Sequence, residues 1–472
     1  MHFRQYLDSR FIILLLLASV LLYLYVLNPT PIAAEIVRSD SATHDEFISL
    51  LQRPDPVLAD KTLQRLDENW SAGFTPMLLE TVKYSSSTYV RNRLMQMLAQ
   101  KTGEKDIGDM ADWYQWLWHQ PENMWPEYGE FKASLYALID PKFEAYFRGR
   151  QASAQIRLDE IQWGGVVQDG IPPLRNPSML KASEADYLGD DDIVFGVAIN
   201  GDVRAYPKRI LAWHEMFVDS FGEGADKQAI AGVYCTLCGT VIIYKTQHKE
   251  VSHQLGTSGF LYRSNKLMYD KATQSMWSTV RGEPVLGPLV GKGIVLEHLS
   301  VVTTTWKEWR RRHPETLVLS LDTGYRRNYD EGVAYKDYFS NDRLMFDTPF
   351  SDKRLQNKQE VLALRFFAAP NQQLAIDTDF LSKHPVYSNQ IGPQKFVVLT
   401  DATGANRVYD PGQVVFVEYD GLDTVIDSTG KSWSISEQSL VSADGETLEH
   451  LPYHRAFWFG WHAAFPETKL IK

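Results

Sequence analysis

The pattern of apolar and polar residues divides the chain into three stretches. Residues 11–27, "FIILLLLASVLLYLYVL", form a charge-free apolar run, and residues 40–150 carry apolar side chains at helical spacing in several short segments. One such helical face is formed by Val90, Leu94, Met97 and Leu98. From about residue 155 onward, short β-rich runs alternate with turns. The pattern therefore predicts an α+β protein with an N-terminal membrane anchor, an all-α domain of helical hairpins and a β-rich region.

The run at residues 11–27 is just long enough to span a bilayer, and it is longer than the usual core of a cleavable signal. Arg4 and Arg10 precede it, and no Lys or Arg follows before Arg38. Because cytoplasmic flanks carry the excess of positive charge, the N-terminus is expected to stay in the cytoplasm. No good A-x-A cleavage site occurs up to Ala34, so an uncleaved anchor is favoured over a signal peptide. The sequence thus predicts a single-pass membrane protein whose C-terminal part lies outside the cytoplasm.

The β-rich region repeats itself. Residues 296–319 align without gaps on residues 448–471, with Leu, Glu, His, Leu, Trp, Trp, Pro, Glu and Thr in register. Such self-similarity indicates two copies of one unit, each burying a face against the other. Two copies are therefore predicted, over residues 155–345 and 346–472.

Both cysteines of the chain lie in a part of the first copy that the second copy lacks. Between Asp219 and Asp270, the first copy has about 30 residues more than the second copy has at the matching place. This insertion contains Cys235 and Cys238, in the stretch "YCTLCGTVIIY". A shared scaffold with a cysteine-bearing insertion in one copy suggests that the insertion carries the function.

The two cysteines are expected in the turn of a β-hairpin, because the strand-like runs "AIAGVY" and "VIIYK" flank them. A CxxCG turn of this kind is similar to the metal-binding knuckles of zinc ribbons and rubredoxins, and Gly239 permits the positive φ that they need. A redox CxxC of the thioredoxin type opens a helix instead, and "GTVIIY" is a poor helix start. A metal site is favoured, while a redox or structural disulfide and a pair of inert thiols stay open.

Two thiolates do not complete a metal site, and the chain has no further cysteine. His214 is the best candidate for a third ligand, because helical spacing places it on an apolar face. The other residues expected on this face are Ile210, Leu211, Phe217 and Val218. The alternative is a buried histidine bonded to backbone, which His384 at the matching place of the cysteine-free copy favours. Zinc is the metal expected for two thiolates and an imidazole, with copper or iron as alternatives.

Three further residues are candidates for catalytic roles. Glu215 is expected about 100° round the helix from His214, at the rim of a cleft. Ser258 and Asn265 belong to "GTSGFLYRSNKLMYD", which ends the insertion, and they are candidates to line a polar pocket beside the cysteines, with plain turn roles as the alternative. The order G-x-S-G differs from the G-x-S-x-G nucleophile elbow, so a serine hydrolase is not expected.

Composition narrows the classes of partner. A net charge of −11 argues against non-specific binding to nucleic acid, which needs a basic surface. The helical domain shows no catalytic pattern, so a protein partner is the role expected for it, while the membrane is the partner of the N-terminal run.

Six motifs in order resemble one family, the bacterial domain of unknown function 3179. They are "DGIPPL", "VRAYPKRILAWHE", "YCTLCGTVI", "GTSGFLYRSNKLMYD", "SMWS" and "HPETLVL", and the resemblance covers about residues 155–472. The pattern Tyr-Cys-x-Leu-Cys-Gly of the family is matched by Tyr234, Cys235, Leu237, Cys238 and Gly239. The resemblance implies that these motifs belong together, and it supplies no established reaction.

With the resemblance to a bacterial family, the prediction is a single-pass protein of the bacterial inner membrane with its C-terminal part in the periplasm, which binds one metal ion through Cys235, Cys238 and His214. Three protein ligands would leave an open position for catalysis, but the sequence names no substrate. The rival interpretations are a thiol–disulfide redox protein that uses the same cysteines and a non-catalytic interaction module. Whether the protein is an enzyme is left open.

Overall fold

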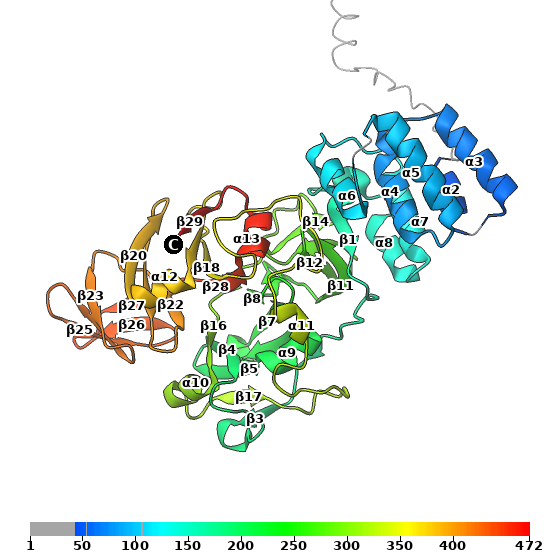
Figure 1. The fold of residues 1–472 in the computed structure, drawn as a ribbon. Helices are drawn as coiled ribbons and strands as arrows, with labels where there is room; N and C mark the ends of the chain where they lie inside the picture. The colour runs from blue at the N-terminus through cyan, green and yellow to red at the C-terminus, as the bar shows by residue number, and fades with distance from the viewer. Residues whose placement is uncertain (1–42, 53, 105–106) are drawn as a thin grey trace, which may run out of the picture.

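The computed structural model describes residues 43–52, 54–104 and 107–472 (Figure 1). These residues form a mixed α+β protein, in which a helical region over residues 43–147 precedes a β-rich region of several sheets. The predicted anchor at residues 11–27 lies outside the described residues. Among the residues that the structure describes, no helix is both long enough and apolar enough to cross a membrane.

The helical region consists of short helices whose ends carry recognisable signals. The helices are α2 (Thr43–Leu51), α3 (Pro56–Glu68), α4 (Thr75–Tyr84), α5 (Thr88–Thr102), α6 (Met110–His119), α7 (Tyr128–Ala137) and α8 (Glu144–Phe147). The Asp55 side chain accepts hydrogen bonds from the first turn of α3, and Gly103 ends α5 at φ +78°. The four residues predicted to share one helical face are all buried in α5.

The first half of the β-rich region holds three five-stranded sheets. Their strand orders are β1-β11-β12-β13-β14, β15-β8-β7-β6-β2 and β16-β4-β5-β17-β3. The strands are β1 (Ile161–Trp163), β2 (Leu174–Arg175), β3 (Met179–Lys181), β4 (Ile193–Ile199), β5 (Asp202–Pro207), β6 (Met216–Phe221), β7 (Gln228–Cys235), β8 (Thr240–Lys245), β11 (Leu255–Tyr262), β12 (Asn265–Asp270), β13 (Met276–Ser278), β14 (Glu283–Leu286), β15 (His298–Leu299), β16 (Val302–Thr305) and β17 (Leu317–Leu319). A small hairpin of β9 (Gln247–His248) and β10 (Val251–Ser252) and two helices, α9 (Lys208–His214) and α10 (Trp306–Arg312), complete this half.

The second half has sheets of four, three and five strands. Their strand orders are β28-β18-β19-β29, β20-β21-β22 and β23-β24-β25-β26-β27. The strands are β18 (Glu360–Arg365), β19 (Gln373–Asp377), β20 (Val386–Ile391), β21 (Gln394–Thr400), β22 (Asn406–Tyr409), β23 (Phe416–Tyr419), β24 (Thr424–Asp427), β25 (Ser432–Ile435), β26 (Ser439–Ser442), β27 (Thr447–Glu449), β28 (His454–Phe457) and β29 (Lys469–Ile471). The helices are α12 (Thr378–Lys383) and α13 (Trp458–Ala464), while α11 (Lys336–Phe339) lies in the connection between the halves.

One sheet of each half has the same construction. The shared part is four strands, β16-β4-β5-β17 in one sheet and β28-β18-β19-β29 in the other. In each, the fourth strand (β17 or β29) runs parallel to the third, and the other pairs are antiparallel. A helix precedes that last strand in both halves, and its second tryptophan donates a hydrogen bond to a threonine seven residues on: Trp309 to Thr316 at 3.1 Å, and Trp461 to Thr468 at 2.9 Å. The boundary at residue 345 between two copies stays a prediction of the sequence.

The helical region packs against the sheet that contains β11 (Figure 1). The ring of Phe260 on β11 lies 4.8 Å from the ring of Tyr136, 4.7 Å from that of Phe143 and 5.3 Å from that of Phe147. Aromatic pairs at such distances add to the apolar burial. The helical region and the first half therefore share one hydrophobic core.

Candidate functional site

The two cysteines lie in the turn between β7 and β8, as the sequence predicts. β7 ends at Cys235, which stands opposite Thr240 in the antiparallel pairing, and Gly239 in the turn has φ +58°. Cys235 and Cys238 are joined by a disulfide, with their Cα atoms 5.5 Å apart. The hairpin turn therefore holds an oxidised cysteine pair.

The disulfide is buried under residues from three parts of the chain. Cys235 is 2% exposed and Cys238 is fully buried. Their apolar neighbours are Leu237, Leu261, Tyr338, Phe457 and Phe459. The hydroxyl of Tyr338 donates to the carbonyl of Leu237 at 2.6 Å, and the amide of Phe457 donates to the carbonyl of Cys238 at 2.9 Å. The turn is thus held both by the connection between the halves and by the second half.

A glycine of α13 allows the second half to approach the turn this closely. A Cβ atom built on Gly460 would lie 2.7 Å from the Cβ atom of Cys238, which is closer than real carbon atoms approach. The carbonyl of the same glycine accepts a hydrogen bond from the Asn265 amide at 2.9 Å. Gly460 therefore contacts both Cys238 and Asn265.

A buried ion pair lies beside the cysteine turn. Glu215 and Lys266 are 4% and 7% exposed, and they form an ion pair with each other. The backbone carbonyl of Glu215 accepts a hydrogen bond from the amide of Tyr234, next to Cys235, and the Tyr335 hydroxyl donates to the Glu215 carboxylate at 3.1 Å. Taking two charges out of water is costly, so this pair needs either a structural or a chemical reason.

The prediction of the helical face around His214 is wrong in its second part. Helix α9 ends at His214, because Glu215 adopts a left-handed conformation at φ 54°. Phe217 and Val218 do not continue the helix; they lie on strand β6, which pairs with β7. Glu215 consequently does not lie on the helix at the rim of a cleft but is buried at the start of the sheet that carries the cysteine turn.

Both ring nitrogens of the buried His214 have hydrogen-bond partners. Nδ1 lies 2.9 Å from the carbonyl of Pro172 and must donate to it, so Nε2 accepts from the Tyr329 hydroxyl at 2.6 Å. That hydroxyl is also 2.7 Å from the hydroxyl of Thr323. Burial lowers the pKa of His214 below 6.5, although the Pro172 carbonyl opposes this shift. This arrangement matches the backbone-bonded alternative that the sequence left open.

Within the described part of the chain, no three or more His, Cys, Asp or Glu residues gather in a way that could hold a metal ion. Cys235, Cys238 and His214 accordingly do not form such a group in this structure. The disulfide sulfurs are not thiolates, which are the form that binds metal. Zinc binding therefore stays a prediction for the reduced pair.

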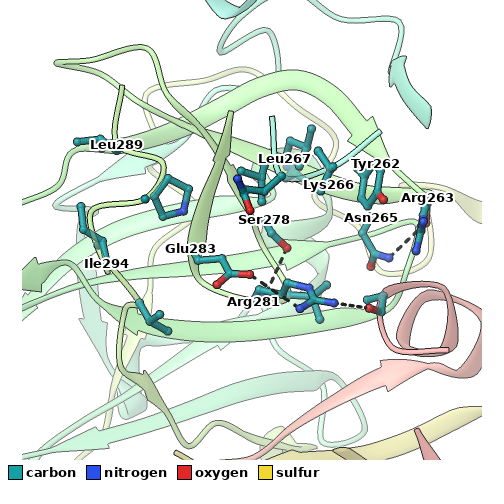
Figure 2. Close-up of a pocket in the computed structure, with 18 of the residues that line it drawn as sticks. Tyr262, Arg263, Asn265, Lys266, Leu267, Ser278, Arg281, Glu283, Leu289 and Ile294 are labelled. Carbon is teal, nitrogen blue, oxygen red and sulfur yellow. Dashed lines mark hydrogen bonds and ion pairs between the residues drawn. The ribbon is translucent and has the colours of Figure 1, made fainter. Parts of the chain in front are cut away.

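Ser258 and Asn265 have different surroundings. Ser258 is fully buried; its hydroxyl donates to the carbonyl of Leu267 at 2.6 Å and accepts from the amide of Phe260 at 3.0 Å. Asn265 donates from Nδ2 to the carbonyls of Gly460 and Arg263, while its Oδ1 is buried without a hydrogen-bond partner. Asn265 also lines the pocket shown in Figure 2 and Ser258 does not. Of the two, Asn265 is the one placed to meet a ligand.

The sequence argument missed three residues of the site: Lys266, Tyr335 and Tyr338. Lys266 carried a usable signal, because a lysine inside the apolar strand "NKLMYD" needs a buried partner. The two tyrosines carried none, since the segment around α11 has no apolar periodicity and contacts the turn about 100 residues away in sequence.

Comparison with known proteins finds one family. A family model described as "Protein of unknown function (DUF3179)" matches residues 168–468, which is more than half of the chain. The resemblance carried by the six motifs is thereby confirmed. Neither the curated proteins nor the solved structures contain a significant match.

Proposed function

Since the chain belongs to the DUF3179 family, whose description assigns no reaction, we propose its function from the geometry: thiol–disulfide exchange at Cys235 and Cys238. The observation that carries this proposal is the disulfide itself, in a turn flanked by a buried ion pair. The redox interpretation was the rival of the metal site at the level of sequence, and the bonded sulfurs favour it.

A purely structural disulfide at this place would add little stability. The stabilisation from a cross-link grows with the length of the loop that it closes, and a four-residue loop gives only about 2 kcal/mol. The hairpin is already held by the pairing of β7 with β8, from Ile230 opposite Lys245 to Cys235 opposite Thr240. A structural role therefore explains the disulfide between Cys235 and Cys238 less well than redox chemistry does.

The proposed reaction oxidises a substrate that carries two thiols. One substrate thiolate attacks a sulfur of the disulfide, which forms a mixed disulfide and releases the other cysteine as a thiolate. The second substrate thiolate then attacks the substrate sulfur of the mixed disulfide and displaces the first cysteine. The substrate leaves as a disulfide, two electrons pass to Cys235 and Cys238, and the two protons of the substrate thiols end on these cysteines.

The Glu215–Lys266 pair is proposed to serve this exchange. An ammonium group stabilises a nearby thiolate, and a carboxylate accepts and returns the proton. Glu215 lies beside the residue before Cys235, and Lys266 follows Asn265, whose amide bonds to Gly460 against Cys238. The pair thus flanks the turn from two places, the residue before β6 and strand β12.

Access to the buried sulfurs requires the connection between the halves to move. Tyr338 bonds to the turn, and Tyr335 bonds to Glu215, so the segment around α11 covers both parts of the site. Replacing Tyr338 by Ala is expected to speed reduction of the disulfide by a small dithiol, because it removes the hydrogen bond and the ring above the turn.

We include the periplasm and the membrane anchor in this proposal. Disulfides persist in oxidising compartments such as the periplasm, which agrees with the location expected from residues 11–27. A protein partner at the helical region stays a prediction. The two copies over residues 155–345 and 346–472 are likewise proposed, and the matching strand order of the two four-strand sets supports them.

The test is the reduction potential of the pair in the purified full-length chain, read from alkylation of thiols in redox buffers. Structural disulfides lie below about −300 mV, so a potential above that value is expected and a lower one would overturn the proposal. Lys266→Gln is expected to slow exchange at least about tenfold, while Lys245→Gln, at the partly exposed end of β8 away from the turn, leaves the rate unchanged. Metal bound in stoichiometric amount to the reduced pair, and lost in Cys235→Ser/Cys238→Ser, would favour the metal site instead.

A further inference from the structure

A second site lies on the far side of Asn265. A pocket of about 570 Å³ opens between β12, β13, β14 and the following loop (Figure 2). Its size falls within the range of pockets that hold small organic molecules. Three cationic side chains, Arg263, Lys266 and Arg281, line it together with Glu283.

Of these three cations, Arg281 is the one without a carboxylate oxygen within 3.5 Å. Arg263 is paired with the buried Glu160, and Lys266 is paired with Glu215. Arg281 lies 3.9 Å from the Glu283 carboxylate, which is too long for a hydrogen bond. Arg281 therefore has donors left for a ligand in the pocket.

The Arg281 side chain is 46% exposed and has charged neighbours of both signs. One of its nitrogens donates to the carbonyl of Ala464 at 3.1 Å. Partial burial lowers the pKa of Arg281; Glu283 and Tyr262 oppose this shift, and the charges of Arg365 and Arg263 add to it. A bound carboxylate would accept the hydrogen bonds that the Glu283 carboxylate is too distant to accept.

Asn265 offers the complementary polar group. Because Nδ2 donates to two backbone carbonyls, those of Gly460 and Arg263, the orientation of the amide is fixed and Oδ1 must be the free acceptor. This oxygen is buried and has no hydrogen-bond partner, and Asn265 as a whole is 5% exposed. A buried acceptor without a donor is costly, so a ligand with an N–H or O–H group would satisfy it.

The remaining wall of the pocket is largely apolar. Its apolar side chains are Ile156, Leu267, Val280, Val285, Leu289, Ile294 and Val295. Burying an aliphatic group against them would contribute through the hydrophobic effect.

We propose that this pocket binds a small organic carboxylate that also carries an N–H donor and an aliphatic side chain, the chemistry of an N-acylated amino acid. The carboxylate bonds to Arg281, the N–H donates to Oδ1 of Asn265, and the aliphatic group packs on the apolar wall. This binding goes beyond thiol–disulfide exchange and does not depend on the state of the cysteines.

The experiment is calorimetric titration of the full-length chain with N-acetyl-leucine. Two matched probes remove one feature each: N-acetyl-leucine amide has no charge, and 4-methylpentanoate has no N–H. Saturable binding of N-acetyl-leucine is expected, with at least about tenfold weaker binding of each matched probe.

Variants locate the binding. Arg281→Gln is expected to weaken N-acetyl-leucine at least about tenfold, and Arg281→Lys to restore part of the loss, because a cation without the planar fork still attracts the carboxylate. Arg93→Gln, an exposed arginine of the helical region, is the control and leaves binding unchanged. Circular dichroism of each variant separates lost binding from lost folding.

Three results would overturn the proposal: no saturable binding in the millimolar range, equal binding of the uncharged amide, or full binding by a folded Arg281→Gln chain. Titration of the Cys235→Ser/Cys238→Ser chain separates the two sites, since binding there must persist even if the redox proposal fails.

Discussion

The two halves of the β-rich region differ most where their shared framework ends. In the first half, the strand pair β4–β5 leads into α9 and then to Glu215 and the cysteine hairpin; in the second half, β18–β19 leads into α12 and then to Pro385 and a plain hairpin. His214 and His384 occupy the matching places, yet His214 is buried with two partners while His384 is exposed. The framework therefore forms without the cysteines, the carboxylate or the buried histidine.

Each half has a buried ionic cluster, but the two clusters serve different places. In the first half, Glu215 and Lys266 lie at the cysteine turn. In the second half, Arg407 is 1% exposed and pairs with Asp401 and Glu437. The second cluster has no cysteine near it, so we assign it a structural role. The stability lost when it is broken can be compared with the effect of breaking the Glu215–Lys266 pair.

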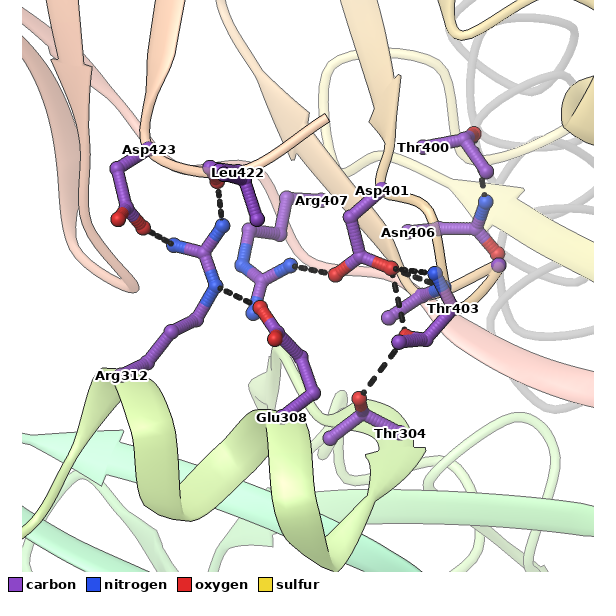
Figure 3. Close-up of polar contacts among 12 residues, drawn as sticks. Thr304, Glu308, Arg312, Thr400, Asp401, Thr403, Asn406, Arg407, Leu422 and Asp423 are labelled. Atoms are coloured by element: carbon purple, nitrogen blue, oxygen red, sulfur yellow. Dashed lines mark hydrogen bonds and ion pairs between the residues drawn. The ribbon is translucent and has the colours of Figure 1, made fainter. Parts of the chain in front are cut away.

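The second cluster also lies at the junction of the halves (Figure 3). Helix α10 of the first half places Arg312 against the carbonyl of Leu422 and 3.1 Å from the carboxylate of Asp423. On the same side, the hydroxyls of Thr304 and Thr403 lie 3.4 Å apart. The framework of one half is thus fastened to the loops of the other.

The largest expected effect is the loss of the structural cluster. Arg407→Met leaves Asp401 and Glu437 buried without a counter-charge, which is expected to cost about 3–5 kcal/mol of unfolding free energy. Denaturant unfolding measures this loss. Lys431→Met, a partly exposed lysine paired with the exposed carboxylates of Asp444 and Glu446, is the control and should change stability by less than about 1 kcal/mol.

Acid should act on the same cluster. Burial alone would raise the pKa of Glu437, but the charge of Arg407 and the hydrogen bonds from Arg407 and His313 bring it well below 4.5. A carboxylate with a lowered pKa stabilises the fold above its unfolded pKa, so stability is expected to fall as the pH drops below about 4.5. If Arg407→Met unfolds no more readily than wild type, or loses no acid sensitivity, the cluster is not structural.

The second effect tests the contact between Gly460 of α13 and Cys238 of the cysteine turn. Gly460→Ala would place a methyl group against Cys238, whereas the matching position of α10 holds Glu308 without difficulty. Overpacking of this kind is expected to destabilise the chain by about 1–3 kcal/mol. Gly189→Ala, whose new Cβ would meet only ordinary contacts near 3.8 Å from Asp192, is the control. A neutral result at position 460 would mean that α13 does not press on the disulfide.

The third effect uses the two matching histidines. His214→Phe removes the partner of the Tyr329 hydroxyl and of the Pro172 carbonyl, which is expected to cost about 1–3 kcal/mol. His384→Phe, on the exposed copy of this position, is expected to stay within about 0.5 kcal/mol of wild type. Thermal or denaturant unfolding of both variants measures the difference.

The pH dependence of stability gives a second measure of His214. Because burial lowers the pKa of His214, the unfolded chain takes up a proton more readily than the folded chain, and stability is expected to decrease as the pH falls below about 6.5. His214→Phe should flatten this part of the profile. An unchanged profile in His214→Phe would contradict the lowered pKa of His214.

Sequence patterns predicted the elements of this fold better than its site. The face of α5, the hairpin at the cysteines and the positive φ of Gly239 follow from local spacing, and the structure has all three. Phe217 and Val218 show the limit of such patterns, because a short apolar run fits one helical turn as well as the end of a strand. The left-handed Glu215 decides between the two, and no residue type there predicts it.

The partners of the site could not be predicted because they come from distant parts of the chain. Lys266 meets Glu215 only because two different sheets pack together, and Tyr338 reaches the turn from a connection without periodicity. The metal hypothesis joined Cys235, Cys238 and His214 because all three have ligand chemistry, whereas the fold gives His214 two other partners. Residue types predicted the chemistry, and tertiary contacts determined which residues share it.

The smallest expected effect concerns the exposed edge of the junction between the halves. Arg311 pairs with Asp423 at 2.8 Å, and both side chains are more than one-third exposed. Solvent screens such a pair, so Arg311→Gln is expected to cost only about 0.2–1 kcal/mol. The loss should shrink as salt is added, because the Debye length shortens. Arg312→Gln, whose side chain is 4% exposed and bonds to Leu422, should cost more and respond less to salt. Equal losses of unfolding free energy in Arg311→Gln and Arg312→Gln would contradict this prediction. They would mean that surface charge, and not the buried contact of Arg312, joins the two halves.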